Sequence, residues 1–280
     1  MDKINGITFF FADGRLFGLH VHRLGESCAM DYYTRTFSNR LRRNILWIYL
    51  PISRQDRPLM LGIREGRQLR NQSIVIRTKL VGDVIVGMQC KGAIRDWNFG
   101  VSAPLTMIYG EPKQGSSINL FGAYCRIPAD EGPANPVFRL PNPSGSTMDD
   151  NAYFSWAPLS GVSSTLVFYD EHNGACKGIL FRYRNGGARA VGQCRLQVDP
   201  TQGVDQPVRV CFRVDSCSSR FNRTLYLTRV KFEQTPQVGG TAEDEGWESH
   251  QMEGMIKFWF TTESGFVAVE DGVPPSQSQP

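Results

Sequence analysis

The fold is decided by the stretch from Leu166 to Gly192, which reads LVFYDEHNGACKGILFRYRNGGARAVG. Apolar and polar residues alternate on both sides of a polar turn, which is the pattern of two antiparallel strands joined by a hairpin. An earlier stretch, from Leu61 to Gly87, has the same length and the same pattern. This repetition indicates a β-sheet unit that has been duplicated within the chain.

The two stretches correspond position by position. The earlier one contributes Leu61, Ile63, Glu65, Ile74, Ile76, Arg77, Gly82, Val86 and Gly87; the later one contributes Leu166, Phe168, Asp170, Ile179, Phe181, Arg182, Gly187, Val191 and Gly192. A weaker third copy covers residues 9–23, where Gly18, Leu19 and Val21 match Gly178, Ile179 and Phe181.

The chain as a whole favours an all-β fold, because strand-like segments recur and almost none has helical periodicity. We expect a β-sandwich or jelly-roll-like fold with two duplicated sheet units, and a β-prism lectin-like arrangement is the alternative. The first unit covers residues 1–127 and the second 149–271. Residues 128–148 form a proline-rich connector, since proline cannot donate to a sheet ladder. Residues 272–280 are typical of a disordered tail, and only residues 31–43 suggest a helix early in the chain.

Composition limits the partners. The 280 residues carry a net charge of +4, and the basic residues are scattered. A nucleic-acid partner is therefore not expected, because no basic stripe with interleaved aromatic residues is present. No apolar run approaches the ~20 residues that span a bilayer, and no signal peptide is visible, so we expect no membrane partner. The seven cysteines include no Cys-x-x-Cys pair, which favours a reduced, cytoplasmic protein.

Alternation along the strands predicts which side chains face the core. The expected core positions are Leu19, Val21, Ile74, Ile76, Ile179 and Phe181. The opposite face then carries His20, His22, Val75, Arg77, Leu180, Arg182 and Arg184. This second face is either washed by water or forms a concave surface that grips a polar or anionic ligand, a task for which the planar guanidinium group is suited.

His20 and His22 stand two positions apart on one strand and would share a face. With Gly14 and Glu26 they resemble the first metal-binding motif of the cupin family, which would imply a metal site. The likeness stops at Tyr33, where that family has a glycine, and neither His172 nor His250 supplies its later histidine. We therefore expect no metal and interpret His20 and His22 as partly exposed strand histidines. Phosphate-loop and dinucleotide motifs are also missing, so no cofactor is expected.

Asp170 and Glu171 are further candidates for chemistry, in the turn of the second copy beside His172. Together with His20 and His22, these carboxylates could act as general acids and bases. The other interpretation is ordinary turn chemistry, since the Asn173-Gly174 pair that follows is a strong hairpin signal.

Aromatic residues offer a binding surface. Trp97 and Trp156 lie in loop-flanking contexts and could stack on a sugar ring or a polycyclic ligand, while Arg77 and Arg182 would supply polar contacts. The alternative for both tryptophans is packing in the core or between the two units.

Several phrases resemble the β-rich C-terminal region of fungal F-box-type and uncharacterised proteins. They are Phe154-Ser-Trp-Ala-Pro-Leu159, Gly178-Ile-Leu-Phe-Arg-Tyr-Arg-Asn-Gly186, Val191-Gly-Gln-Cys-Arg195, Phe17-Gly-Leu-His-Val-His-Arg23 and Trp47-Ile-Tyr-Leu-Pro51. The resemblance covers most of residues 7–270 and implies a fungal source. The F-box itself is missing, so the likeness implies a stand-alone β module and supplies no catalytic residues.

Three functions fit these patterns. The first is a ligand-binding β module, lectin-like or for a small fungal metabolite, with a carbohydrate or small molecule as its partner. The alternative is a cofactor-independent cyclase, isomerase or lyase of fungal secondary metabolism, which would preorganise its substrate in an aromatic-lined cavity. The third is a protein-interaction domain that uses a sheet edge or loop, and a homodimer is compatible with all three.

Overall fold

The computed structural model describes residues 4–23, 25, 28–66, 72–90, 94–100, 105–111, 115–125, 138–141, 148, 151–218, 224–235 and 246–271. These residues form nineteen strands and two short helices, so the chain is all-β, as predicted. The helices are α1 (Ala29–Thr36) and α2 (Asn39–Arg42), which divide the predicted helical stretch at Phe37.

The strands have the following bounds: β1 (Ile4–Ala12), β2 (Arg15–Arg23), β3 (Leu46–Pro51), β4 (Pro58–Gly66), β5 (Gln72–Thr78), β6 (Gly82–Gly87), β7 (Ile94–Gly100), β8 (Thr106–Tyr109), β9 (Phe121–Tyr124), β10 (Tyr153–Pro158), β11 (Val162–Tyr169), β12 (Cys176–Tyr183), β13 (Ala188–Gly192), β14 (Thr201–Asp205), β15 (Arg209–Ser218), β16 (Thr224–Glu233), β17 (Glu248–Gln251), β18 (Met255–Phe260) and β19 (Gly265–Glu270).

Among the described strands, every pairing is antiparallel and six sheets form. Two sheets have four strands, in the orders β6-β5-β4-β7 and β13-β12-β11-β14. Three sheets have three strands, in the orders β2-β1-β3, β10-β18-β19 and β16-β15-β17, and β8 pairs with β9 alone.

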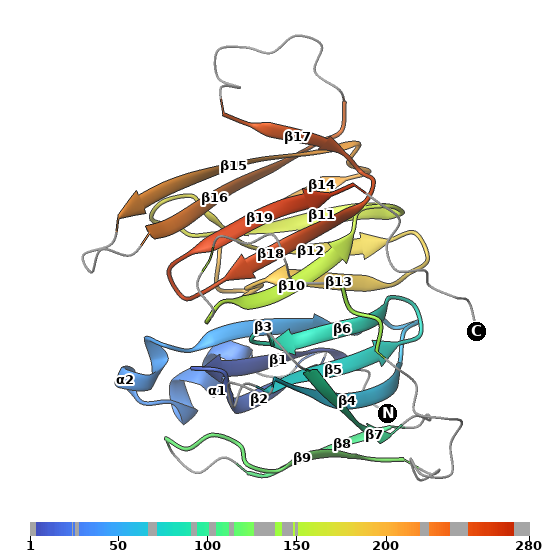
Figure 1. The fold of residues 1–280 in the computed structure, drawn as a ribbon, viewed down its shortest axis with the longest axis vertical. Coiled ribbons are helices and arrows are strands. Elements are labelled where there is room, and N and C mark those ends of the chain that lie inside the picture. The colour runs from blue at the N-terminus through green and yellow to red at the C-terminus, as the bar shows by residue number, and fades with distance from the viewer. Residues whose placement is uncertain are drawn as a thin grey trace.

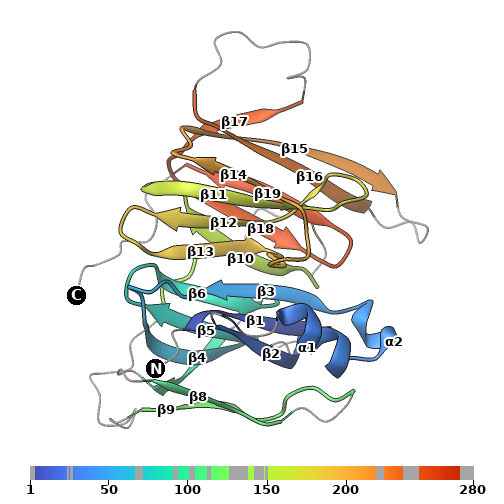
Figure 2. The same cartoon turned by 180° about the vertical axis from the view of Figure 1, so that it is seen from behind.

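The sheets are arranged in two lobes that share two layers. The first lobe, β1–β9 with both helices, lies below the second lobe, β10–β19 (Figure 1). At their junction β3 lies beside β13 and β6 lies beside β10. Opposite views place β10, β18 and β19 in front in Figure 1 and β11–β13 in front in Figure 2. One layer therefore runs from β2-β1-β3 into β13-β12-β11-β14, the other from β7-β4-β5-β6 into β10-β18-β19, as in a β-sandwich.

A single hydrophobic core runs between the two layers through both lobes. Leu19, Ile74, Ile76, Ile179 and Phe181 are all buried in it, as predicted from the alternation, and Val21 packs against it at partial burial. The period of two along each strand places these side chains on one face of their sheet.

The outer faces of the layers are also covered in places. Val75 is fully buried in a cluster with Trp259 on one outer face. Leu180 packs with Tyr49 and Phe168 on the other. The prediction of a water-washed face opposite the core is therefore wrong at Val75 and Leu180. Each outer cluster joins residues of both lobes, so it ties the lobes together.

The duplicated unit has the same topology in both copies. In each, a three-strand meander (β4-β5-β6 or β11-β12-β13) gains a fourth strand (β7 or β14) beside its first strand. The position-by-position match fails in one place: Leu166 and Phe168 face the outer cluster, and Val167 faces the core. The predicted third copy does form a hairpin, β1–β2. It differs from the other two copies because β2 is an edge strand among the described strands, whereas its counterpart β12 has a neighbour on each side.

The closer counterpart of the β1–β2 hairpin is β18–β19, at the far end of the chain. Ile7-Thr-Phe-Phe-Phe11 in β1 and Ile256-Lys-Phe-Trp-Phe260 in β18 occupy equivalent positions. Phe9 pairs with Ile48 of β3, and Phe258 pairs in the same way with Ser155 of β10. Each lobe is thus completed by a hairpin from its own end of the chain.

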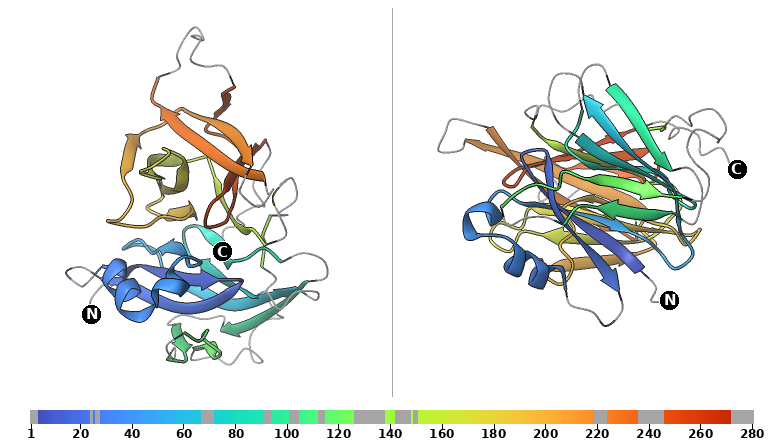
Figure 3. Two further views of the ribbon diagram at one scale, coloured as in Figure 1. Left: turned by 90° about the vertical axis from the view of Figure 1, so that its left-hand side faces the viewer. Right: turned by 90° about the horizontal axis from the view of Figure 1, so that it is seen from below.

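Smaller features complete the fold. Helix α1 lies against β1 and β2 (Figure 3), where Phe37 packs on Phe10 and Trp47. Two residues of the predicted connector, Phe138 and Met148, pack in the outer cluster that contains Val75 and Trp259. Of the connector only residues 138–141 and 148 are described, and the predicted tail lies outside the described residues. No helix among the described residues has the length and apolar character needed to cross a membrane.

Candidate functional site

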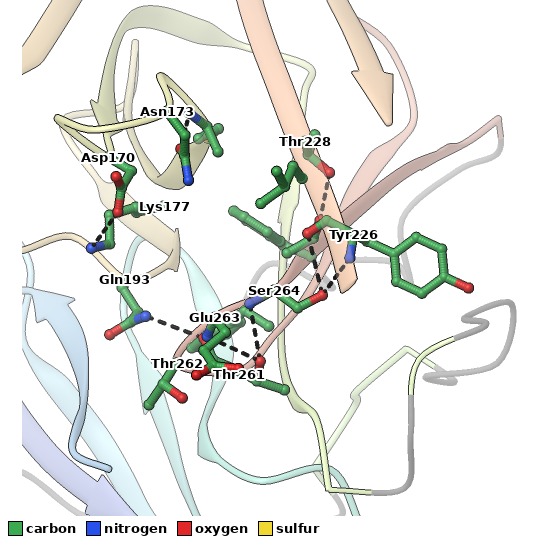
Figure 4. Close-up of a pocket in the computed structure, with 16 residues that line it drawn as sticks. Asp170, Asn173, Lys177, Gln193, Tyr226, Thr228, Thr261, Thr262, Glu263 and Ser264 are labelled. Carbon is green, nitrogen blue, oxygen red and sulfur yellow. Dashed lines mark hydrogen bonds and ion pairs between the residues drawn. The ribbon is translucent and has the colours of Figure 1, made fainter. Parts of the chain in front are cut away.

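A groove opens at one end of the second lobe, between the two layers (Figure 4). The groove is shallow and open to solvent, and its cavity volume is only about 40 Å³. The turn between β11 and β12 forms one rim, and the turn between β18 and β19 forms the other. Core residues, including Cys176, Phe258 and Phe260, line its floor.

The first rim is a rigid hairpin turn. The Asn173 side chain accepts a hydrogen bond from the Ala175 amide at 2.8 Å, and Gly174 has a φ of +68°. Asp170 accepts from the His172 amide at 3.0 Å and pairs with Lys177 at 3.3 Å. Burial alone would raise the pKa of Asp170, but the His172 amide and Lys177 outweigh it, and the net pKa lies below its ordinary value. Asp170 is therefore a carboxylate at neutral pH.

The second rim uses its own hydroxyl groups to hold its shape. Thr261 Oγ1 accepts hydrogen bonds from the amides of Glu263 at 3.3 Å and Ser264 at 3.1 Å. Ser264 Oγ accepts from the Tyr226 amide at 2.8 Å, which anchors the turn to β16. Gln193 donates to the Thr261 carbonyl at 3.3 Å and so connects this turn to the other layer.

Several polar side chains of the rims remain available. Neither the Thr262 hydroxyl nor the Glu263 carboxylate has a hydrogen bond with a described residue, and the Asn173 amide nitrogen has none either. Figure 4 shows Asn173 on one side of the groove and Thr262 and Glu263 on the other, so both rims carry polar groups. Such an arrangement can hydrogen-bond a ligand that carries both donors and acceptors, as hydroxyl groups do.

The structure places the predicted site residues in four separate regions. Asp170 lines the groove, and Glu171 is exposed in the same turn. The other predicted residues lie outside this groove. The opposite rim was not predicted from the sequence, because Thr261-Thr-Glu-Ser264 reads as an ordinary polar turn.

His20 and His22 lie on the outer face of the first lobe. Their rings are 4.8 Å apart, and the His22 ring meets the Tyr49 ring at 5.3 Å. His22 Nε2 is 2.7 Å from Thr8 Oγ1. The expectation of a partly exposed pair is wrong for His20, which is buried, because α1 brings Tyr32 against it.

Arg182 joins this group. Burial raises the pKa of Tyr49, and the nearby Arg182 guanidinium partly offsets this rise, which places Arg182 close to the Tyr49 ring. Three predicted residues therefore do come together, around an unpredicted tyrosine. Arg182 is exposed. This group lies at the opposite end of β12 from Lys177 and the groove.

Burial and the nearby His20 lower the pKa of His22 to about 4. His22 is therefore neutral in the folded protein at neutral pH. In the unfolded chain its pKa is 6.5, so between about pH 4 and pH 6.5 the unfolded state binds more protons. The stability that His22 contributes is present above pH 6.5 and is lost as the pH falls towards 4.

We expect His22→Gln to make the unfolding free energy depend less steeply on pH between about 4 and 6.5. The decrease in slope should correspond to at most about one bound proton. Urea unfolding at a series of pH values measures this slope. His172→Gln, at an exposed histidine in a turn, is the matched control and should keep the slope. An unchanged slope in the His22 variant would show that His22 titrates normally.

Arg77 and Trp156 both lie within packed networks. Arg77 forms a two-pronged ion pair with Asp83, at 2.6 and 2.8 Å. Trp156 is buried under the guanidinium group of Arg189, 4.0 Å from its ring centre. Trp156 lies near the end of β10 and is buried in the cluster that joins the two lobes, which fits the alternative of packing rather than ligand stacking.

Trp97 stands apart at 41% exposure, on β7 rather than in a loop. Its ring stacks with Arg95 at 3.7 Å, and its Nε1 donates to Glu65 at 3.1 Å. It is the one predicted tryptophan with a face open to solvent.

No group of three or more metal-ligating side chains is brought together among the described residues. Glu26 of the cupin-like motif lies outside them. No protein-family model matches the chain. A comparison with curated protein sequences gives no match either.

Proposed function

We propose that the chain is a ligand-binding β module and that it takes a hydroxyl-rich ligand, a carbohydrate, in the groove between the β11–β12 and β18–β19 turns. The observation that carries the proposal is the set of available polar groups on two rigid rims. Asn173 and Lys177 offer donors on one rim, and Thr262 and Glu263 offer a hydroxyl and a carboxylate on the other. Preorganised rims reduce the entropy lost on binding.

The groove supports this function better than it supports a cyclase, isomerase or lyase. Such an enzyme needs aromatic side chains around an open volume. The aromatic rings near His20 and His22 pack instead on one another, as in the stacking of Phe10 on Tyr32 at 5.4 Å. The groove is polar at its rims and shallow at hairpin turns, which suits a sugar.

A cytoplasmic location is part of the proposal. All seven cysteines belong to the described residues, and none of them forms a disulfide. Reduced thiols persist in a reducing compartment.

The binding proposal is tested with Glu263→Gln and Thr262→Val on an immobilised glycan panel. Both changes preserve the turn, whose internal hydrogen bonds use the Thr261 hydroxyl and backbone amides. A lost hydrogen bond to a charged group is worth about 1.5–3 kcal/mol, so we expect Glu263→Gln to weaken binding by roughly 10- to 100-fold.

Glu171→Gln is the matched control, because Glu171 is an exposed carboxylate on the facing turn and does not line the groove. It should bind as the unchanged protein does. Equal binding by the Glu263 and Glu171 variants, or no binding to any glycan, would remove the proposal.

A further inference from the structure

Exposed apolar side chains gather at the free end of the first lobe. Of the seven large hydrophobic side chains that are exposed among the described residues, six fall between residues 94 and 124: Ile94, Trp97, Ile108, Tyr109, Leu120 and Tyr124. Strands β7, β8 and β9 carry or adjoin them, at the end away from the second lobe (Figure 1). Such concentrations of apolar surface mark interaction sites.

The hairpin β8–β9 has two different faces. Its inner face packs on the central core through Met107, Phe121 and Ala123. Its outer face consists of the alternate residues Thr106, Ile108, Gly110, Leu120, Gly122 and Tyr124, and we call these six residues the hairpin face. None of them is charged. Natural proteins usually protect such strands with charged residues.

Across the hairpin face, each row joins a large residue to a small one. Tyr124 pairs with Thr106, and Gly122 pairs with Ile108. In the third row the Gly110 amide donates to the Leu120 carbonyl at 2.8 Å. The large members are exposed by 65%, 45% and 59% for Tyr124, Ile108 and Leu120.

The small member of the middle row leaves open space beside it, since a Cβ atom added at Gly122 would meet nothing within 4 Å. At Gly110 a Cβ atom would stand 3.3 Å from the Leu120 Cβ, so the space in that row is already narrowed by its own large member. The hairpin face is therefore a pattern of protruding side chains that changes side from row to row, with an open hole at Gly122. The protruding side chain of the middle row is on β8, and those of the rows above and below it are on or next to β9.

We infer that the hairpin face binds a second copy of this chain. A twofold axis parallel to the strands, midway between two facing hairpins, places β8 of each copy over β9 of the other. Every row then meets its own counterpart: Ile108 lies over the partner copy's Gly122, and Leu120 over its Gly110. Two sheets packed this way lie about 10 Å apart, which the exposed side chains can fill.

A copy of the chain fits this face because it repeats the same spacing and brings no charge. The face is small, since each copy contributes three rows of two residues. Specific protein interfaces bury about 800 Å² per partner, so the dimer should be weak and depend on protein concentration. This interface is separate from the groove and does not depend on the proposed function.

The test uses a charge exchange across the axis. Ile108→Lys places an ammonium group over the partner's Gly122, and Gly122→Glu places a carboxylate over the partner's Ile108. Gly122 does not have a positive φ, so a side chain is tolerated there. Ile4→Lys is the matched control, because Ile4 is 38% exposed and belongs to β1, outside the hairpin face.

Sedimentation from about 1 to about 200 μM brackets the Kd of a weak dimer. The unchanged chain and Ile4→Lys should dimerise as concentration rises. Ile108→Lys and Gly122→Glu should each stay monomeric with unchanged melting temperatures. Their equimolar mixture should dimerise again, since the two introduced charges then face each other.

Three results would overturn the inference. They are a monomeric unchanged chain over this range, single variants that still dimerise, and a mixture that stays monomeric. The first would assign the hairpin face to a different partner, and the other two would place the dimer contact or its axis elsewhere.

Discussion

Replacing Arg189 with methionine is expected to lower the free energy of unfolding by about 3–5 kcal/mol. Arg189 is 1% exposed and lies on β13 of the second lobe. Its Nη2 donates to the carbonyl oxygens of Val81 at 2.7 Å and Asp83 at 2.6 Å, both in the first lobe. Its Nη1 donates to the Trp156 carbonyl at 3.3 Å. One buried cation thus joins the two lobes through two carbonyl groups of the first lobe and also binds the Trp156 carbonyl of its own lobe.

Methionine preserves much of the side-chain volume but supplies no donors. The carbonyl groups would remain buried without these partners, and each such loss costs about 1–3 kcal/mol. Urea unfolding measures the change. Arg182→Met, at an exposed position on the neighbouring strand, should stay within about 0.5 kcal/mol of the unchanged chain. Equal stability of the two variants would show that Arg189 does not join the lobes.

The second large effect is expected at Gly192, where β13 ends with a φ of +69°. An alanine Cβ would stand 2.4 Å from the Lys177 carbonyl oxygen and 2.5 Å from the Phe258 ring. The positive φ costs about 1–2 kcal/mol in any non-glycine residue, and the overlap with backbone and core adds about 1–3 kcal/mol. We expect Gly192→Ala to destabilise the chain by about 2–5 kcal/mol.

Gly161 separates the two causes. Its φ is +75°, and a Cβ there would meet nothing within 4 Å. Gly161→Ala should therefore cost only the conformational part, about 1–2 kcal/mol. Thermal melts of both variants give the comparison. If the Gly192 and Gly161 variants lost the same amount of stability, the close contacts at Gly192 would contribute nothing to the destabilisation.

The strand faces could be predicted from the sequence where one strand is considered alone. Alternation of apolar residues places Ile74 and Ile76 of β5, and Ile179 and Phe181 of β12, in the core. The correspondence between the two copies fails on β11 because a bulge shifts the register there. Ile63 pairs with Ile74, whereas the partner of Ile179 is Val167. The turns have equal lengths, but β12 has one extra residue, Lys177, between the partners of Phe168 and Tyr169, and this bulge reverses the facing of Leu166.

The candidate site could be predicted only in part. The Asp170 turn has a local signal, the Asn-Gly hairpin pattern that follows it. The opposite rim comes from β18–β19, far along the chain, and nothing near Glu263 indicates that it meets Asp170. The roles of Arg77 and Arg189 were also hidden, because each depends on a partner that only the register or the lobe junction brings close.

The central claim is that the groove between the two turns binds a carbohydrate. Amide chemical-shift mapping during titration with a glycan selected on the panel tests it most directly. The account predicts that the changes concentrate in residues 170–177 and 261–265, the two rims. Shifts confined to the His22 and Tyr49 region or to the hairpin face, with both rims unchanged, would contradict it.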